Sequence, residues 1–355
     1  MQSPLGPLHI ARTDYGQADM PLPVNSLPNL ASARLGAKVV SVTDDFFAKA
    51  DLMLADTPPQ FDPDAYDDHG KEMDGWESRR KRLPGRDHAV VRLAVPGTLE
   101  LVDIDTSFFT GNYPLAAGLE GCHCAPGMDP GPETAWVPLI SPIALQGDSH
   151  CLGTIVHPEP VSHVRLTQFP DGGIARLRLY GLPAPAPHQG GDGPVNLASV
   201  LAGGRILGVS NRHYGTPWPI LYPDAPANMG DGWETARRRA PGFEWILIGL
   251  GQAGHVQRIE LETTHFKGNY PKLVSVSAAP LDPALMALPG AAIAAESLHW
   301  TEILPKTATG PDGQFGFDIA PGTETQILRL DLHPDGGVAR LRVFAEPLPP
   351  AASSL

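Results

Sequence analysis

The chain has 355 residues, which is long for a single hydrophobic core and predicts two domains of ordinary size. Its net charge of −13 argues against a nucleic-acid or anionic-membrane partner, because a surface that contacts phosphates needs a basic face. The 38 Gly and 39 Pro predict many short strands and argue against long helices.

The cysteines indicate the redox compartment. Cys122, Cys124 and Cys151 cannot all pair with one another, and a disulfide-stapled secreted domain would carry more cysteines. The N-terminus shows no apolar signal core, and no uncharged run is long enough to span a bilayer. We therefore expect reduced thiols, no membrane partner and a cytoplasmic protein.

A repeated tetrapeptide indicates where folded structure begins. Asn29–Ser32 reads Asn-Leu-Ala-Ser and recurs as Asn196–Ser199, and each copy is a candidate for a short helix. The residues before the first copy are rich in proline, and those before the second form a Pro/Gly linker. The expected parts are an N-terminal arm (1–28), a first repeat (29–181), a linker (182–195) and a second repeat (196–347). A further short helix is expected within 283–295.

The most charged stretch of the chain, His69–Arg82, is partly duplicated. Its Asp-Gly-Trp-Glu core and trailing arginines recur 157 positions later, in Asp231–Arg239. His69 and Lys71 do not recur, and the first copy holds ten extra residues around a proline-broken loop at 56–63. This pattern predicts one unit built twice, with additional chemistry in the first copy.

The strand signals are also duplicated. Alternating β-branched residues predict two strands in each repeat: Ala89–Leu93 and Leu99–Asp105, with counterparts Trp245–Ile248 and Val256–Glu262. A Gly-Asn-Tyr-Pro turn follows in each repeat, and each repeat ends in a Pro-Asp-Gly-Gly turn with a one-sided strand after it. The sequence therefore predicts an all-β fold of two antiparallel β-sandwiches, of jelly-roll or another Greek-key arrangement.

These doubled segments, together with the His69–Arg82 stretch, resemble the allantoicase family from Asn29 to Phe344. The resemblance implies two jelly-roll repeats of the galactose-binding, lectin-like type, often assembled as homo-oligomers. It also implies hydrolysis of allantoate to ureidoglycolate and urea in purine breakdown. One departure is Thr167–Phe169, which precedes the first Pro-Asp-Gly-Gly where a histidine such as His333 is expected.

Allantoate is a small carboxylate whose central carbon carries two ureido groups, so its anion has to be held. The planar fork of arginine suits a carboxylate. The candidates for substrate binding are Arg79 or Arg80 and, in the second repeat, Arg237 or Arg238, together with Glu234. Adjacent residues of a strand point to opposite faces, so at most one arginine of each pair is expected to enter the site.

Loss of urea also requires a proton donor, because urea is a poor leaving group. The candidates for catalysis in the first repeat are His69, Lys71 and Glu77. Pairing with an arginine is the alternative for Glu77. Turn formation is the stronger interpretation for Asp74 and Asp231, and core packing for Trp76 and Trp233.

The second repeat offers His213 as a further catalytic candidate. Asn211–Gly215 stands where the first repeat has Asp44–Ala48, and this exchange would suit two halves of a composite site. Asp44 and Asp45 could act as a pair of carboxylate bases, but solvated charge at the end of a strand is the stronger interpretation.

Cys122–Cys124 and the His150-Cys151 pair contain soft ligands, but their spacing fits no tetrahedral zinc pattern. We therefore expect no metal ligands and no required cofactor. A catalytic divalent ion remains the open alternative.

Other classes of protein fit the fold. A tandem jelly roll could instead be a carbohydrate- or small-anion-binding module without catalysis. The asymmetry between the repeats favours the enzyme, and the intact His69–Arg82 stretch argues against an inactive structural subunit.

Overall fold

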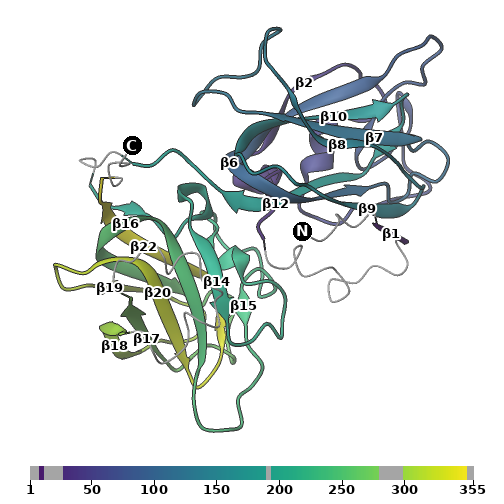
Figure 1. The fold of residues 1–355 in the computed structure, drawn as a ribbon. Helices are drawn as coiled ribbons and strands as arrows, with labels where there is room; N and C mark the ends of the chain where they lie inside the picture. Colours follow the sequence, from purple (N-terminus) through teal and green to yellow (C-terminus); the bar gives the residue numbers. More distant parts are fainter. Residues whose placement is uncertain (1–7, 12–26, 189–192, 280–298, 350–355) are drawn as a thin grey trace. The chain divides into compact units, whose positions relative to one another are not determined.

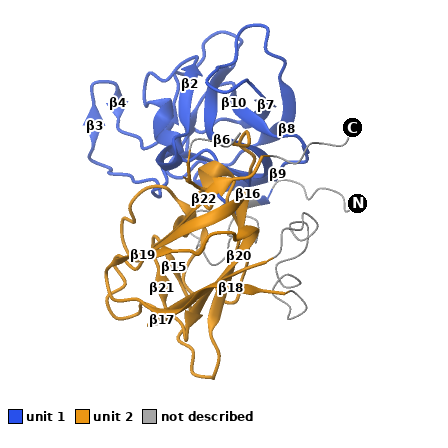
Figure 2. Ribbon diagram, turned by 90° about the vertical axis from the view of Figure 1, so that its left-hand side faces the viewer, with its two compact units in different colours: residues 1–182 blue, residues 183–355 orange. Residues whose placement is uncertain are grey.

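The computed structural model describes residues 8–11, 27–188, 193–279 and 299–349. The chain forms two compact units, Met1–Leu182 and Pro183–Leu355 (Figure 2). The short helix expected within 283–295 lies outside the described residues, as does most of the expected arm. Leu8–Ala11, within that arm, form strand β1, which pairs with β9.

The first unit is built on an eight-stranded sheet with the order β1-β9-β6-β10-β7-β8, while β12 and β2 also pair with β6 (Figure 1). The strands after β1 are β2 (Lys38–Val42), β6 (Asp87–Asp105), β7 (Ala116–Cys122), β8 (Val137–Ala144), β9 (Ser149–Thr154), β10 (Val161–Phe169) and β12 (Arg176–Pro183). β10 runs antiparallel to both β6 and β7.

The second unit repeats this topology, with the order β13-β22-β16-β20-β17-β18 and with β14 and β19 paired to β16. Its strands are β13 (Val195–Asn196), β14 (Arg205–Val209), β16 (Glu244–Glu262), β17 (Leu273–Ala278), β18 (Thr301–Ala308), β19 (Gln314–Asp318), β20 (Glu324–His333) and β22 (Arg340–Pro347). The predicted all-β fold, a duplicated antiparallel β-sandwich, is therefore confirmed.

The expected division of the central segment into two strands is wrong in both units. β6 and β16 are each continuous over 19 residues. The strand runs on through Pro96-Gly97, and a Cβ at Gly97 would lie 2.3 Å from Leu30 Cδ1 and 2.7 Å from Leu182 O. Glycine thus allows the strand to pass close to its neighbours without ending.

The described residues contain 3-10 helices and no α-helix. Two of them, η3 (Ala33–Leu35) and η5 (Val200–Ala202), follow the Asn-Leu-Ala-Ser segments directly, and Ser32 and Ser199 accept their capping hydrogen bonds. The other two are η4 (Ala50–Leu54) and η6 (Trp218–Leu221). None of these described helices has the length and apolar character needed to cross a membrane.

Short two-stranded ladders lie beside each main sheet. β5 (Trp76–Glu77) pairs with β11 (Gly173–Ile174), and β15 (Trp233–Glu234) pairs with β21 (Gly337–Val338). The first unit also has the hairpin β3 (Tyr66–Asp67) and β4 (Gly70–Lys71), which has no counterpart among the described residues of the second unit. Its second strand, β4, lies in the charged stretch that distinguishes the first repeat.

Candidate functional site

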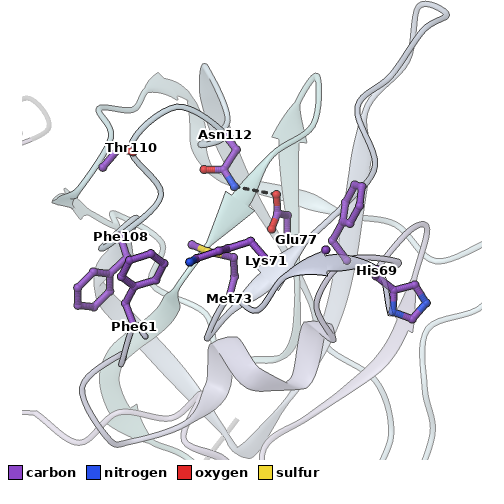
Figure 3. Close-up of a pocket in the computed structure, with 10 residues that line it drawn as sticks. Phe61, His69, Lys71, Met73, Glu77, Phe108, Thr110 and Asn112 are labelled. Atoms are coloured by element: carbon purple, nitrogen blue, oxygen red, sulfur yellow. Dashed lines mark hydrogen bonds between the residues drawn. The ribbon is translucent and has the colours of Figure 1, made fainter. Parts of the chain in front are cut away.

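A pocket of about 330 Å³ lies in the first unit, beside the ladder of β5 and β11 (Figure 3). It is lined by Phe47, Phe61, His69, Gly70, Lys71, Met73, Glu77, Phe108, Thr110 and Asn112. The structure thus brings together the three residues of the first repeat that the sequence marks as catalytic candidates.

Glu77 is positioned by the buried tryptophan that precedes it. Trp76 is fully buried, and its Nε1 donates to the backbone oxygen of Asp44 at 2.8 Å. The backbone of Glu77 pairs with Gly173 on one side and with Ala48 on the other. The core interpretation of Trp76 is confirmed, and its packing fixes the carboxyl beside it.

The carboxyl of Glu77 has one defined partner, the side-chain amide of Asn112. Asn112 Nδ2 donates to Glu77 Oε1 at 2.7 Å (Figure 3). Burial raises the pKa of Glu77, and the hydrogen bond from Asn112 offsets only part of this effect. Among the described residues no arginine pairs with the Glu77 carboxyl.

Asn112 is held by the contact of two turns. Its backbone oxygen accepts a hydrogen bond from Gly173 N at 2.7 Å. Gly172 has φ +142°, and a Cβ there would lie 2.5 Å from Pro114 N, so only glycine allows the Pro-Asp-Gly-Gly turn to approach so closely. The two doubled turn motifs therefore support the Glu77–Asn112 pair.

Lys71 brings a positive charge to the pocket from the β3–β4 hairpin. Its ammonium donates to the backbone oxygen of Pro63. It also lies over two aromatic rings, 5.1 Å from the centroid of Phe61 and 4.5 Å from that of Tyr66. Phe61 stacks on Phe108 with 5.4 Å between ring centroids, so the cation is flanked by an aromatic wall (Figure 3).

His69 lies at the edge of this pocket. Its imidazole is turned away from Glu77 and Lys71 (Figure 3) and packs against Phe46 with ring centroids 4.5 Å apart. Its Nδ1 is 3.9 Å from Asp67 Oδ2, and the side chain is 46% exposed. In this conformation the imidazole does not point at the Glu77 carboxyl.

The structure does not place Arg79 and Arg80 among the lining residues; both are exposed. Arg79 Nε donates to Asp44 Oδ2 at 2.7 Å. Burial raises the pKa of Asp44, but hydrogen bonds from Arg79 and Phe46 outweigh that effect and lower it overall. Asp45 pairs with Lys49 at 3.3 Å. Asp44 is therefore engaged in holding the loop beside Trp76.

The second unit has a pocket of about 430 Å³ around Glu234, the counterpart of Glu77. Asn269 Nδ2 donates to Glu234 Oε1 at 2.6 Å, which repeats the carboxyl–amide pair of the first unit. The lining residues are Tyr214, Glu234, Thr235, Arg237, Arg238, Gly268, Asn269, Tyr270, Lys272, Pro334, Asp335 and Gly336. Three of the predicted substrate-binding residues of the second repeat thus share one pocket.

The two arginines of this second pocket differ in their surroundings. Arg238 Nη1 donates to Glu244 Oε1 at 2.8 Å, as Lys81 does to Asp87 in the first unit, while Arg237 is exposed. His213 is not among the lining residues, and its ring packs against Tyr214 at 4.4 Å. The sequence shift places Asn228 where the first unit has Lys71.

The interpretation of Asp74 and Asp231 as structural residues is supported by the buried arginines that follow the Pro-Asp-Gly-Gly turns. Arg176 is fully buried and donates to Asp74 Oδ2 at 2.7 Å, and Asp74 also accepts from Gln60 N at 2.9 Å. Arg340 and Asp231 repeat this pairing at 3.0 Å. These ion pairs hold the His69–Arg82 stretch and its counterpart Asp231–Arg239 against their respective sandwiches.

Sequence reasoning missed Asn112 and Asn269, because the Gly-Asn-Tyr-Pro motif was interpreted only as a turn. A polar side chain repeated at the same place in both copies was the available signal. It also missed Phe61 and Phe108, whose contact joins residues 47 positions apart and leaves no local pattern.

The fold and the pocket define a class of protein: a tandem β-sandwich whose first unit holds a pocket lined by a carboxyl and a cation. The allantoicase repeat matches residues 28–184 and 195–348. The chain therefore belongs to the allantoicase family.

Relatives and solved structures agree with this assignment. The chain is 46% identical to a probable allantoicase of Stutzerimonas stutzeri over 92% of its length and 98% of the relative, and 48% identical to one of Pseudomonas fluorescens over 91% and 97%. It is similar to the crystal structure of allantoicase from Saccharomyces cerevisiae, with a TM-score of 0.70, 28% identity and coverage of 96% of this chain and 99% of that one.

Proposed function

We propose that the first-unit pocket is the site at which this chain hydrolyses allantoate to ureidoglycolate and urea. The chain is a hydrolase of carbon–nitrogen bonds in linear amidines, as membership of the family and the similarity of its relatives support. The observation that carries the choice of pocket is the juxtaposition of the Lys71 ammonium with the Glu77–Asn112 pair.

The reaction requires water to bond to the central carbon of allantoate while the bond from that carbon to one ureido nitrogen breaks. The departing nitrogen then takes up a proton and leaves as urea. Glu77 donates this proton, since burial raises its pKa and keeps a larger share of the carboxyl protonated than in water. The proton that water loses as it bonds to the carbon returns to the Glu77 carboxylate, so no net proton is consumed. Asn112 holds the carboxyl in one orientation.

Lys71 binds the substrate carboxylate. A cation that already lies against Phe61 and Tyr66 is partly shielded from water, which strengthens its attraction for an anion. The pocket volume of about 330 Å³ is at the small end of the usual range for ligand sites, which suits a small metabolite.

The other site residues expected from the sequence stay predictions. His69 reaches the substrate only if its ring rotates from its contact with Phe46. Arg79 and Arg80 do not line the pocket, so they would have to reach the substrate carboxylate from outside it. His213, Glu234, Arg237 and Arg238 would contribute if the second unit holds a site of its own or half of a composite one.

The test is a urea-release assay on allantoate, with and without a chelator, on the wild type and on Lys71→Gln, Glu77→Gln and Arg80→Ala. We expect strong loss in the first two variants and little in the third. A wild type that releases no urea would reject the activity. Unchanged activity in both Lys71→Gln and Glu77→Gln would move the site elsewhere, and loss of activity with chelator would indicate a divalent ion.

Two properties complete the proposal. We propose a cytoplasmic location, which the three free cysteines support. Assembly as a homo-oligomer stays a prediction from the family resemblance, and light scattering coupled to size-exclusion chromatography would test it.

A further inference from the structure

A cluster of soft ligands lies at the end of β7, outside the pocket described above. Cys122 is the last residue of β7 and lies directly opposite His163 of β10. Cys124 follows two residues later, with its Sγ 4.0 Å from Cys122 Sγ. The ligand atoms of Cys122, Cys124 and His163 all lie within 4.8 Å of one another.

This spacing is close to what a tetrahedral zinc ion requires. Zinc–sulfur bonds of about 2.3 Å at the tetrahedral angle separate two sulfur atoms by about 3.8 Å. The two sulfur atoms need to move by only a few tenths of an ångström to reach that separation. A disulfide would need them to approach by nearly 2 Å, since its S–S bond is about 2.05 Å long.

The imidazole of His163 has a partner on each nitrogen. Its Nδ1 is 2.9 Å from Ser162 Oγ, and its Nε2 is 3.0 Å from Asp129 Oδ1. Arg92 Nε in turn donates to Asp129 Oδ1 at 2.9 Å. Whichever nitrogen binds a metal, the other keeps a hydrogen-bond partner that fixes the ring, as is usual for metal-bound histidine.

The second unit shows that the fold itself does not require these polar groups. The identical registers of β7–β10 and β17–β20 place Ala279 and Ile327 where the first unit has Cys122 and His163. Ala279 N donates to Ile327 O at 3.0 Å, and both belong to a buried apolar cluster with Leu247. One thiol and an imidazole of the cluster thus stand where the second unit has ordinary core residues.

We propose that Cys122, Cys124 and His163 bind one Zn²⁺ ion that clasps the loop after β7 to strand β10. Two thiolates and one imidazole form a ligand set that favours Zn²⁺ over ions such as Mg²⁺, which prefer oxygen ligands. Asp129 or Ser162 orients the imidazole, according to which nitrogen binds the ion, and a solvent molecule completes the coordination. The ion lies outside the pocket assigned to allantoate.

Binding is coupled to proton release. In the metal-free chain burial, together with the neighbouring Cys124 thiol, raises the pKa of Cys122 to about 12, so the thiol is protonated at neutral pH. Burial lowers the pKa of His163, although its bond to Asp129 opposes this, and the neutral ring is the form that binds metal.

Cobalt(II) provides the direct test, because thiolate ligation gives it a charge-transfer absorption and tetrahedral geometry gives it intense visible bands. Full-length protein is stripped of metal, kept reduced with a phosphine, and titrated anaerobically with Co²⁺ and then with Zn²⁺. We expect one Co²⁺ per chain, with both sets of bands, and full displacement by Zn²⁺.

The variants separate the cluster from other sites. Cys122→Ala installs the residue of the second unit and is therefore compatible with the fold, and it should weaken Co²⁺ binding by about 100-fold or more, as should Cys124→Ser. Cys151→Ser removes a buried thiol outside the cluster and should leave binding unchanged.

Two results would overturn the proposal. One is a wild type with three titratable thiols that gives no thiolate–cobalt band. The other is a band that survives in Cys122→Ala. Neither outcome depends on the urea-release assay, so the metal site and the proposed activity fail or stand separately.

Discussion

Replacement of Glu77 by Gln tests the proton donor directly. The substitution removes the titrating carboxyl but keeps a side-chain oxygen that can accept the 2.7 Å hydrogen bond from Asn112. General acid catalysis typically contributes about 10² to 10⁴ in rate, or about 2.7 to 5.4 kcal/mol of activation free energy. We expect kcat for urea release to fall by that factor.

Folding stability should not fall with it. Burial raises the folded-state pKa of Glu77 above its unfolded value, so folding disfavours the ionised carboxyl. The contribution of the protonated form is fully present at low pH and is lost as pH rises through the folded pKa. A neutral Gln avoids this loss, and the Tm of Glu77→Gln at neutral pH should equal or exceed that of the wild type.

The matched control is Glu234→Gln, because Asn269 donates to Glu234 at 2.6 Å in the same arrangement. Urea release at saturating allantoate should stay within about tenfold of the wild type in this variant.

The wild-type kcat should fall as pH rises through the pKa of Glu77, and the residual activity of Glu77→Gln should lack that alkaline decrease. The reasoning is refuted if Glu77→Gln keeps more than a tenth of wild-type kcat or if both variants lose activity equally.

Further predictions concern binding and stability. Lys71→Gln should raise KM for allantoate by about 10- to 100-fold, since a charge-assisted hydrogen bond contributes about 1.5–3 kcal/mol. Lys49→Gln, at an exposed lysine, should leave KM unchanged. Equal effects of the two substitutions would contradict the assignment of Lys71 to the substrate carboxylate. Arg176→Leu should destabilise the first unit by about 2–4 kcal/mol in denaturant unfolding, because the backbone oxygens of Thr57 and Asp74 lose their buried donor, at about 1–3 kcal/mol each. A change below about 1 kcal/mol would contradict this. His150→Gln should lower stability at low pH and lower it less at high pH. Burial and Arg178 lower the pKa of His150, but the carboxylates of Asp103 and Asp105 outweigh them and raise it overall. The stabilising contribution of His150 is therefore complete below its unfolded-state pKa and is lost as pH rises through its folded-state pKa. A difference in Tm that does not change with pH would argue against that coupling.

The composition of the site was only partly readable from the sequence. The unduplicated His69 and Lys71 drew attention to the first repeat, and both line its pocket. Charge alone could not tell which cations face a ligand: Arg79 is engaged by Asp44, and Arg238 by Glu244. Such pairings depend on which loops the fold brings together.

The soft-ligand cluster shows the same limit. Cys122 and Cys124 are separated by one residue, and that spacing alone matches no zinc motif. The third ligand, His163, lies 41 positions away and meets Cys122 only through the register of β10 against β7. Sequence spacing reports ligands on one segment, whereas a sheet gathers them from neighbouring strands.

By itself the sequence determined the all-β class, the duplication and the buried tryptophans, because alternation and turn residues act locally and a repeat is visible as letters. Tertiary structure alone decided that β6 continues through Pro96-Gly97, that Asn112 holds Glu77, and that Phe61 flanks Lys71. Each of these depends on contacts between segments distant in the chain. Their energies are set by packing and register, which no local pattern of residues encodes.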